Sequence, residues 1–178
     1  MSELFISIET NGIGSYQPST QRILRVSWIY NDIHNSDIIQ CNHKINPNVG
    51  HNIRTKDTAN GKDFYKVFTK LWNDMNDCSC IVGHNVFFCI DTILNELKQR
   101  KSRYHQIFKT KIKSMYKADM LYCTMKNSVR FCNIATDKGL KFPTLEELEK
   151  KIVGEIQDDV DKVSKIKDIY ETLINLKN

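Results

Sequence analysis

Short apolar runs separated by turn residues occupy the first quarter of the chain. Residues 3–8 are mostly apolar and lead into Asn11-Gly12, a dipeptide typical of turns. Residues 22–31 alternate between polar and apolar side chains, as a half-buried strand does. A third candidate strand covers 37–45 and ends at Asn-Pro-Asn. Three strands at this spacing, joined by short turns, predict an antiparallel meander.

The pattern then changes from strand to helix spacing. Residues 48–61 are polar and irregular, which predicts a surface loop. Over 62–75 the apolar side chains recur at steps of three and four, which predicts an amphipathic helix. A brief buried strand is expected at 80–83 and a second helix over 86–100. The alternation of strand and helix implies a parallel crossover, so the 80–83 strand should lie parallel to the first.

The rest of the chain continues this mixture. A further strand is expected at 120–122, and a last amphipathic helix over 160–176. Thr144 and Glu147 have the spacing of a capping box for a helix over 145–153. No internal repeat or linker interrupts the pattern, so residues 1–178 are expected to form a single α/β domain.

Composition is that of an ordinary folded domain. The 178 residues fit one domain, and 40% hydrophobic with 26% charged residues exclude a disordered or collagen-like chain. No run reaches the ~18 apolar residues that a membrane-spanning helix needs, so no membrane partner is expected. The start lacks the features of a secretory signal, which favours an intracellular location, cytoplasmic or nuclear. Reduced thiols are therefore expected at Cys41, Cys78, Cys80, Cys89, Cys123 and Cys132.

A basic stretch with interleaved aromatic residues covers 98–117. It carries eight Lys or Arg side chains and no acid, in a chain of net charge +5. One interpretation is a pair of solvated helices whose aromatic residues face the core. The other is a surface on which Lys109, Lys111 and Lys113 contact the phosphates of single- or double-stranded DNA or RNA.

Two segments resemble the motifs of the DnaQ-like 3′–5′ exonucleases, the DEDD family of the RNase H-like superfamily. Residues 5–12 read FISIETNG, similar to the first motif, apolar-Asp-apolar-Glu-Thr-x-Gly. Residues 83–89 read GHNVFFC, similar to the second, Gly/Ala-His-Asn-x-x-Phe-Asp. Residues 141–148, KFPTLEEL, resemble the segment before motif three. The resemblance spans about 3–175 and implies an RNase H-like mixed sheet, an antiparallel meander plus parallel strands, flanked by helices.

In that family, four carboxylates hold two Mg²⁺ or Mn²⁺ ions that hydrolyse a phosphodiester, because hard divalent cations prefer carboxylate oxygens. In this chain the first motif's Asp falls on Ser7, its Glu is kept as Glu9, and the second motif's Asp falls on Cys89. Without the motif, Glu9 reads as a polar residue at a strand end and Cys89 as a small buried filler.

The third motif is weaker. The DEDDh branch of the family has His-x-Ala-x-x-Asp before the last helix, with the His as general base, and no His occurs there in this chain. An ungapped alignment puts Asp158 on the His and Val163 on the Asp; a short deletion instead puts Asp159 or Asp161 on the Asp. The resemblance therefore implies either no metal cofactor or weakly bound Mg²⁺ or Mn²⁺ on Glu9 with Asp159 or Asp161.

The matched positions around these motifs imply a nucleic-acid cleft. Its expected members are Thr10, Asn11, Gly12, His84, Asn85 and Phe88. Alternatives remain for two of them, since Asn85 is also a good helix N-cap and Phe88 also suits a core position.

The first function hypothesis is a degenerate exonuclease-like domain, a pseudoenzyme that acts by binding nucleic acid, a protein partner or both. The second is a slow metal-dependent 3′–5′ exonuclease, and the third is a structural subunit of a larger assembly. Abundant Asn, Ile and Lys suggest an AT-rich genome, such as that of a large DNA virus or a protist.

Overall fold

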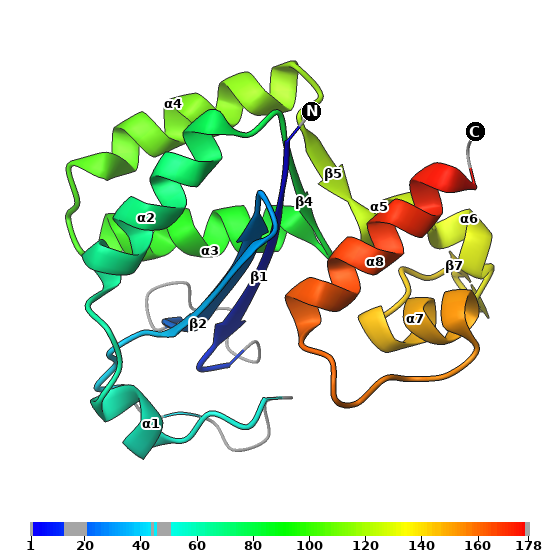
Figure 1. The fold of residues 1–178 in the computed structure, drawn as a ribbon, viewed down its shortest axis with the longest axis horizontal. Coiled ribbons are helices and arrows are strands. Elements are labelled where there is room, and N and C mark those ends of the chain that lie inside the picture. The colour runs from blue at the N-terminus through cyan, green and yellow to red at the C-terminus, as the bar shows by residue number, and fades with distance from the viewer. Residues whose placement is uncertain (1, 13–20, 44, 46–50, 177–178) are drawn as a thin grey trace.

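The computed structural model describes residues 2–12, 21–43, 45 and 51–176. Within this range five strands form one mixed sheet in the order β3-β2-β1-β4-β5, shown in Figure 1. The strands are β1 (Glu3–Thr10), β2 (Ile23–Tyr30), β3 (Ile33–Ile38), β4 (Cys80–Gly83) and β5 (Leu121–Cys123). The first three pair antiparallel, whereas β4 runs parallel to β1 and β5 parallel to β4. The expected meander and the parallel crossover are confirmed.

The third strand differs from the prediction. It covers Ile33–Ile38 rather than 37–45, because Asn31 and Asp32 make a two-residue turn and Tyr30 pairs directly with Ile33. Both turn residues have positive φ, 49° and 58°, which Asn and Asp tolerate better than most residues. The strand lies at the sheet edge and is mostly solvent-exposed, so it lacks the apolar alternation that would reveal it.

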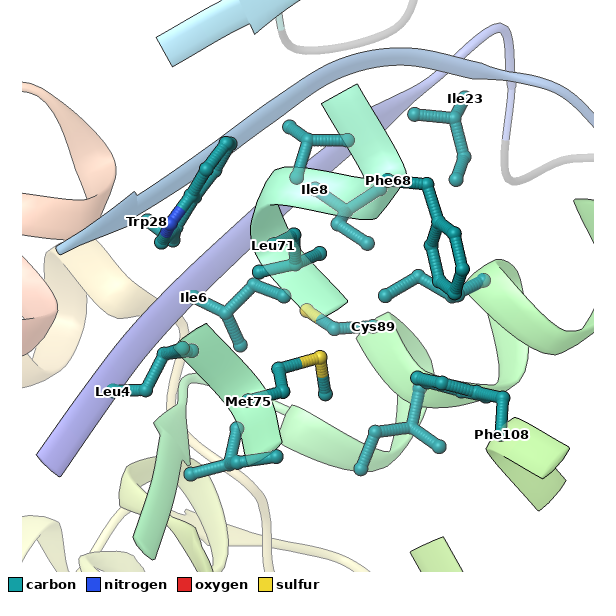
Figure 2. Close-up of a cluster of buried hydrophobic side chains, with 14 of the residues drawn as sticks. Leu4, Ile6, Ile8, Ile23, Trp28, Phe68, Leu71, Met75, Cys89 and Phe108 are labelled. Carbon is teal, nitrogen blue, oxygen red and sulfur yellow. The ribbon is translucent and has the colours of Figure 1, made fainter. Parts of the chain in front are cut away.

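Three helices cover one face of the sheet: α2 (Phe64–Asp77), α3 (Val86–Gln99) and α4 (Tyr104–Lys117). They pack on Leu4, Ile6 and Ile8, alternate residues of β1 that share this face. Figure 2 shows this core, in which Trp28, Phe68 and Phe108 are the largest buried side chains. The main core cluster is on this side, so its burial supplies most of the hydrophobic stabilisation.

The last helix, α8 (Lys162–Asn175), covers the other face, where Val163 and Ile166 pack on Phe5, Ile29 and Val82.

The other elements are short: α1 (Thr55–Ala59), α5 (Thr124–Asn127), α6 (Val129–Cys132), β6 (Ala135–Thr136), β7 (Gly139–Leu140) and α7 (Leu145–Val153). The helix α1 corrects the expectation of a loop throughout 48–61, of which 48–50 lie outside the described residues.

The capping box is confirmed. Thr144 Oγ1 accepts from the Glu147 N–H at 3.1 Å, and Glu147 Oε2 accepts from the Thr144 N–H at 2.8 Å. Among the helices of the described part of the chain, none has the length and apolar character to cross a membrane.

Candidate functional site

A pocket of about 670 Å³ lies where the two exonuclease-like segments meet. Ser7 on β1 lines it together with His84 and Asn85, which precede α3, and with Phe88 and Cys89 in its first turn. Other lining residues come from α5, from the segment that leads into α7 and from residues around the start of α8. They include Met125, Phe142, Pro143, Leu145, Ile156, Asp158, Lys162, Lys165 and Ile166. The tertiary structure thus brings Ser7 and Ile8 of the 5–12 segment together with part of the 83–89 segment, while Glu9 is not among the described residues that line this pocket.

The turn between β4 and α3 is tight for a steric reason. A Cβ at Gly83 would lie 3.1 Å from Val86 Cα and 3.2 Å from the Ile6 carbonyl oxygen, so glycine allows α3 to begin close to β1. Asn85 follows with a left-handed backbone, φ 65°, and occupies the N-cap position of α3. The predicted N-cap position is confirmed, but the Asn85 side chain makes no capping hydrogen bond and lines the pocket instead.

Glu9 is held by two cationic side chains. Its Oε2 lies 3.1 Å from Arg25 Nη1 on β2, and its Oε1 lies 3.1 Å from Lys162 Nζ at the start of α8. The Glu9 side chain is only 11% exposed, so these contacts are shielded from much of the solvent. Both oxygens of the Glu9 carboxylate are therefore paired with cations, and neither Arg25 nor Lys162 was predicted from the sequence as a partner.

Cys89 is a core residue as well as a pocket residue. It is 3% exposed and packs in the cluster that contains Ile6 and Ile8, as Figure 2 shows. Burial raises the pKa of the Cys89 thiol to about 12, so the group is a neutral thiol at physiological pH. A thiol here and a hydroxyl at Ser7 do not fit Mg²⁺ or Mn²⁺, which require carboxylate oxygens in this chemistry.

The three aspartates before α8 have separate surroundings. Asp158 is exposed and lines the pocket, and Asp159 is exposed in the adjoining turn. Asp161 caps α8, since its Oδ1 accepts from the Val163 and Ser164 N–H groups at 3.0 and 3.2 Å. Burial raises the pKa of Asp161, but hydrogen bonds from Ser164 and His34 outweigh it, and the net pKa is lowered.

Val163 is buried against the sheet, as its apolar character requires.

Across the described ranges, no group of three or more His, Cys, Asp and Glu side chains is arranged to hold a metal ion. Glu9 is paired with Lys162, and Asp161 is occupied as a helix cap. The residues present therefore do not fit a two-metal centre.

His84 joins three elements at the pocket. Its Nε2 donates to the Pro143 carbonyl at 3.0 Å, so Nδ1 of the neutral ring accepts from Thr124 Oγ1 at 3.1 Å. Burial lowers the pKa of His84 from its ordinary 6.5, and the Pro143 hydrogen bond opposes this in part. The imidazole of His84 is therefore neutral, and its hydrogen bond to Pro143 positions the segment before α7.

This burial makes folding stability pH-dependent. The contribution of His84 is complete above pH 6.5, its ordinary pKa, and is lost as the pH falls toward the lower folded-state pKa, because the unfolded chain binds the proton more tightly. We expect the urea midpoint to fall between pH 7.5 and 5.5, and to fall less in His84→Gln. An equal fall of the urea midpoint in the intact protein and in His84→Gln would show that His84 does not cause the pH dependence.

Thr10 and Asn11 make hydrogen bonds at the end of β1 in this structure. Asn11 and Arg22 exchange hydrogen bonds, Asn11 N to Arg22 O at 3.1 Å and Arg22 N to Asn11 Oδ1 at 2.8 Å. Thr10 is buried, and its carbonyl contacts His51 Nε2 at 2.9 Å. Neither residue, nor Gly12, is among those that line the pocket, so their contact with nucleic acid remains a prediction.

The basic stretch is not beside the pocket. Its helix α4 packs on the α3 side of the sheet, opposite α8, as Figure 1 shows. Lys109 and Lys113 are exposed, Lys111 Nζ donates to the Asn76 carbonyl at 3.5 Å, and Phe108 faces the core. None of the pocket-lining residues of the described chain comes from 98–117. Contact of these lysines with phosphates remains a prediction, on a surface separate from the pocket.

Comparison with solved structures bears on the fold. The chain is similar to Exonuclease I of E. coli, solved in complex with a dA16 oligonucleotide, with a TM-score of 0.63. The fold is RNase H-like. The match covers 99% of this chain and 41% of the Exonuclease I chain, at 15% sequence identity, so the chain spans less than half of that protein. No protein-family model matches the sequence, and the search of curated protein sequences gave no match.

Proposed function

We propose that this chain is a degenerate 3′–5′ exonuclease-like domain that binds nucleic acid in the Ser7–Cys89 pocket without hydrolysing it. The proposal rests on the contacts of Glu9, whose two carboxylate oxygens face Arg25 and Lys162 at 3.1 Å each. Two-metal hydrolysis needs carboxylates whose charge is available to the metal ions. Here the retained carboxylate is already neutralised by side chains of the protein.

The charges around Glu9 also disfavour a metal ion. A divalent cation near Glu9 would meet the Lys162 ammonium, and Ser7 and Cys89 offer no negative charge to offset that repulsion. Lys162 thus takes the place of a cation at the carboxylate. The neutral thiol at Cys89 fills a position in the buried core.

Binding without cleavage is supported by the lining of the pocket. Phe142 is exposed and offers a ring for a base, whereas Phe88 lines the same pocket but also packs on the main core. Bases of a single strand stack on exposed rings at about 1–3 kcal/mol each. Exonuclease I of E. coli, similar in fold, was solved with an oligonucleotide, which adds support for a single-stranded ligand.

The test is fluorescence anisotropy with a labelled single-stranded oligonucleotide. Phe142 is 57% exposed, so Phe142→Ala should fold normally. We expect it to weaken binding by about fivefold to 150-fold, the loss of one stacked base. The matched control is Phe131→Ala, an exposed ring on α6 that does not line the pocket. Equal affinity of Phe142→Ala and the intact protein would overturn the pocket as the binding site.

The same assay tests the α4 lysines separately. If they contact about three phosphates of a single strand, log affinity should fall with log salt concentration with a slope near −2. Replacing Lys109, Lys111 and Lys113 by Glu should remove most of that slope. An unchanged slope would mean that these three lysines contact solvent and not the phosphates.

A protein partner is the second candidate function. Phe142, Val153 and Ile156 are exposed apolar side chains on and beside α7, and two of them line the pocket. Exposed apolar groups gathered at a pocket are typical of interaction sites. Absence of oligonucleotide binding in the intact protein would favour this candidate.

A further inference from the structure

A second pocket, of about 320 Å³, lies near the end of the sheet at which β2 begins. Arg22, Gln40, Asn42, His43 and Arg100 supply its polar lining. These residues come from the start of β2, the chain after β3 and the end of α3, so only the folded chain assembles them. No carboxylate is among the lining residues within the described chain.

Arg22 carries an unsatisfied donor at this pocket. Its Nη1 is buried and has no hydrogen-bond acceptor in the described part of the protein. The nearest opposite charge is Glu96 Oε2 at 3.9 Å, beyond hydrogen-bonding distance. A buried donor without an acceptor costs about 1–3 kcal/mol, so this site favours a ligand that supplies the acceptor which the described residues do not.

Arg100 is fixed in orientation beside it. Its Nε donates to Glu96 Oε1 at 2.7 Å, and its guanidinium lies 4.8 Å from the centre of the Phe64 ring. Glu96 is 1% exposed, and its Oε2 also accepts from the Ile23 N–H at 3.4 Å. One buried carboxylate is therefore shared by two guanidinium groups, which leaves one positive charge in excess.

We propose that this pocket binds a phosphate group between Arg22 and Arg100. Guanidinium groups match the oxygens of phosphate with paired N–H donors, and a negative charge would offset the excess positive charge. The amides of Gln40 and Asn42 add neutral donors at the mouth. The phosphate is either free or part of a polynucleotide, and the proposal does not depend on binding at the Ser7–Cys89 pocket.

The experiment is an NMR titration of the intact ¹⁵N-labelled protein with inorganic phosphate. We expect saturable shifts confined to residues 22–23, 40–43 and 96–100. Arg22→Gln should weaken binding about tenfold or more, the loss of a charged hydrogen bond. The matched control is Arg130→Gln, an exposed arginine on α6 with the same change of charge, which should bind as the intact protein does.

A second variant covers the case in which Arg22→Gln fails to fold. Asn42 is exposed and lines the pocket, so Asn42→Glu places a negative charge at its mouth without disturbing the core. It should abolish phosphate binding, whereas Gln106→Glu, with the same charge on exposed α4, should not. Phosphate binding that persists in Asn42→Glu, or shifts spread over the basic surface, would overturn the proposal.

A competition arm identifies the source of the phosphate. If a short oligonucleotide displaces inorganic phosphate and produces the same localised shifts, the ligand is a polynucleotide phosphate. If the oligonucleotide does not compete while inorganic phosphate still binds, the ligand is a free phosphate. Binding of neither probe by the intact protein refutes the site, and loss of oligonucleotide binding in Phe142→Ala alone bears only on the other pocket.

Discussion

Incubation with Mg²⁺ or Mn²⁺ and single-stranded DNA or RNA is expected to release no nucleotides. The reason is the charge at the site, where Glu9 is paired with Arg25 and Lys162 while Ser7 and Cys89 are neutral. Metal ions supply several kcal/mol of transition-state stabilisation in such reactions, and each ~1.4 kcal/mol is a factor of ten in rate. The measurement is release of labelled mononucleotides at ordinary enzyme concentration.

Variants sharpen this expectation. Ser7→Asp with Cys89→Asp restores two carboxylates, but activity should still be absent because Lys162 continues to neutralise Glu9. Adding Lys162→Asp removes that cation and supplies a carboxylate from α8, so the triple variant is where metal-dependent activity should first appear. Thermal melting must accompany each variant, since Cys89 is buried and a carboxylate there costs stability.

Two controls separate the protein from contamination. A mock preparation measures nuclease carried over from the host, and Glu9→Ala removes the carboxylate that would have to bind a catalytic metal ion. Robust trimming by the intact protein that disappears in Glu9→Ala and is absent from the mock would show that the chain is an active exonuclease.

Removing Glu149 is expected to destabilise the fold by about 3–5 kcal/mol, as breaking a buried ion pair does. Lys165 Nζ lies 2.8 Å from Glu149 Oε2, and the two side chains are only 10% and 3% exposed. Glu149 Oε1 also accepts from the Gln157 N–H at 3.1 Å. Glu149→Ala leaves the ammonium of Lys165 without its partner, and the segment between α7 and α8 loses an anchor. Urea denaturation measures the free energy of unfolding.

The matched control is an ion pair whose lysine also lies on α8 but whose carboxylate is exposed. Lys167 Nζ pairs with Asp32 at 2.6 Å, but Asp32 is 87% exposed, so Asp32→Asn should change the free energy of unfolding little. Glu149→Leu with Lys165→Met should recover much of the lost stability, because an apolar pair needs no charge compensation. A cost below about 1 kcal/mol in Glu149→Ala would mean that Lys165 reaches water after the change.

Local patterns predicted most of the elements. The capping box at Thr144 and Glu147 located α7 at Leu145–Val153, because both partners lie within one helical turn. The period of three and four over 62–75 located α2, whose apolar stripe must face the sheet. The edge strand β3 was misplaced because one face is solvent and the other carries few apolar residues, which removes the period of two.

The sequence by itself determined the fold class, the likeness of two segments to exonuclease motifs and the neutral residues at Ser7 and Cys89. Only the tertiary structure decided what surrounds Glu9, since Lys162 lies 153 positions away and no local pattern relates the two. The same holds for Arg22, which meets the Glu96–Arg100 pair where β2 passes the end of α3. Glu96 and Arg100 have the i, i+4 spacing of neighbours on one helix, so their own pairing is local. Pairing between charges far apart in the sequence depends on distance in space and on burial, and neither quantity is encoded in the spacing of residues along the chain.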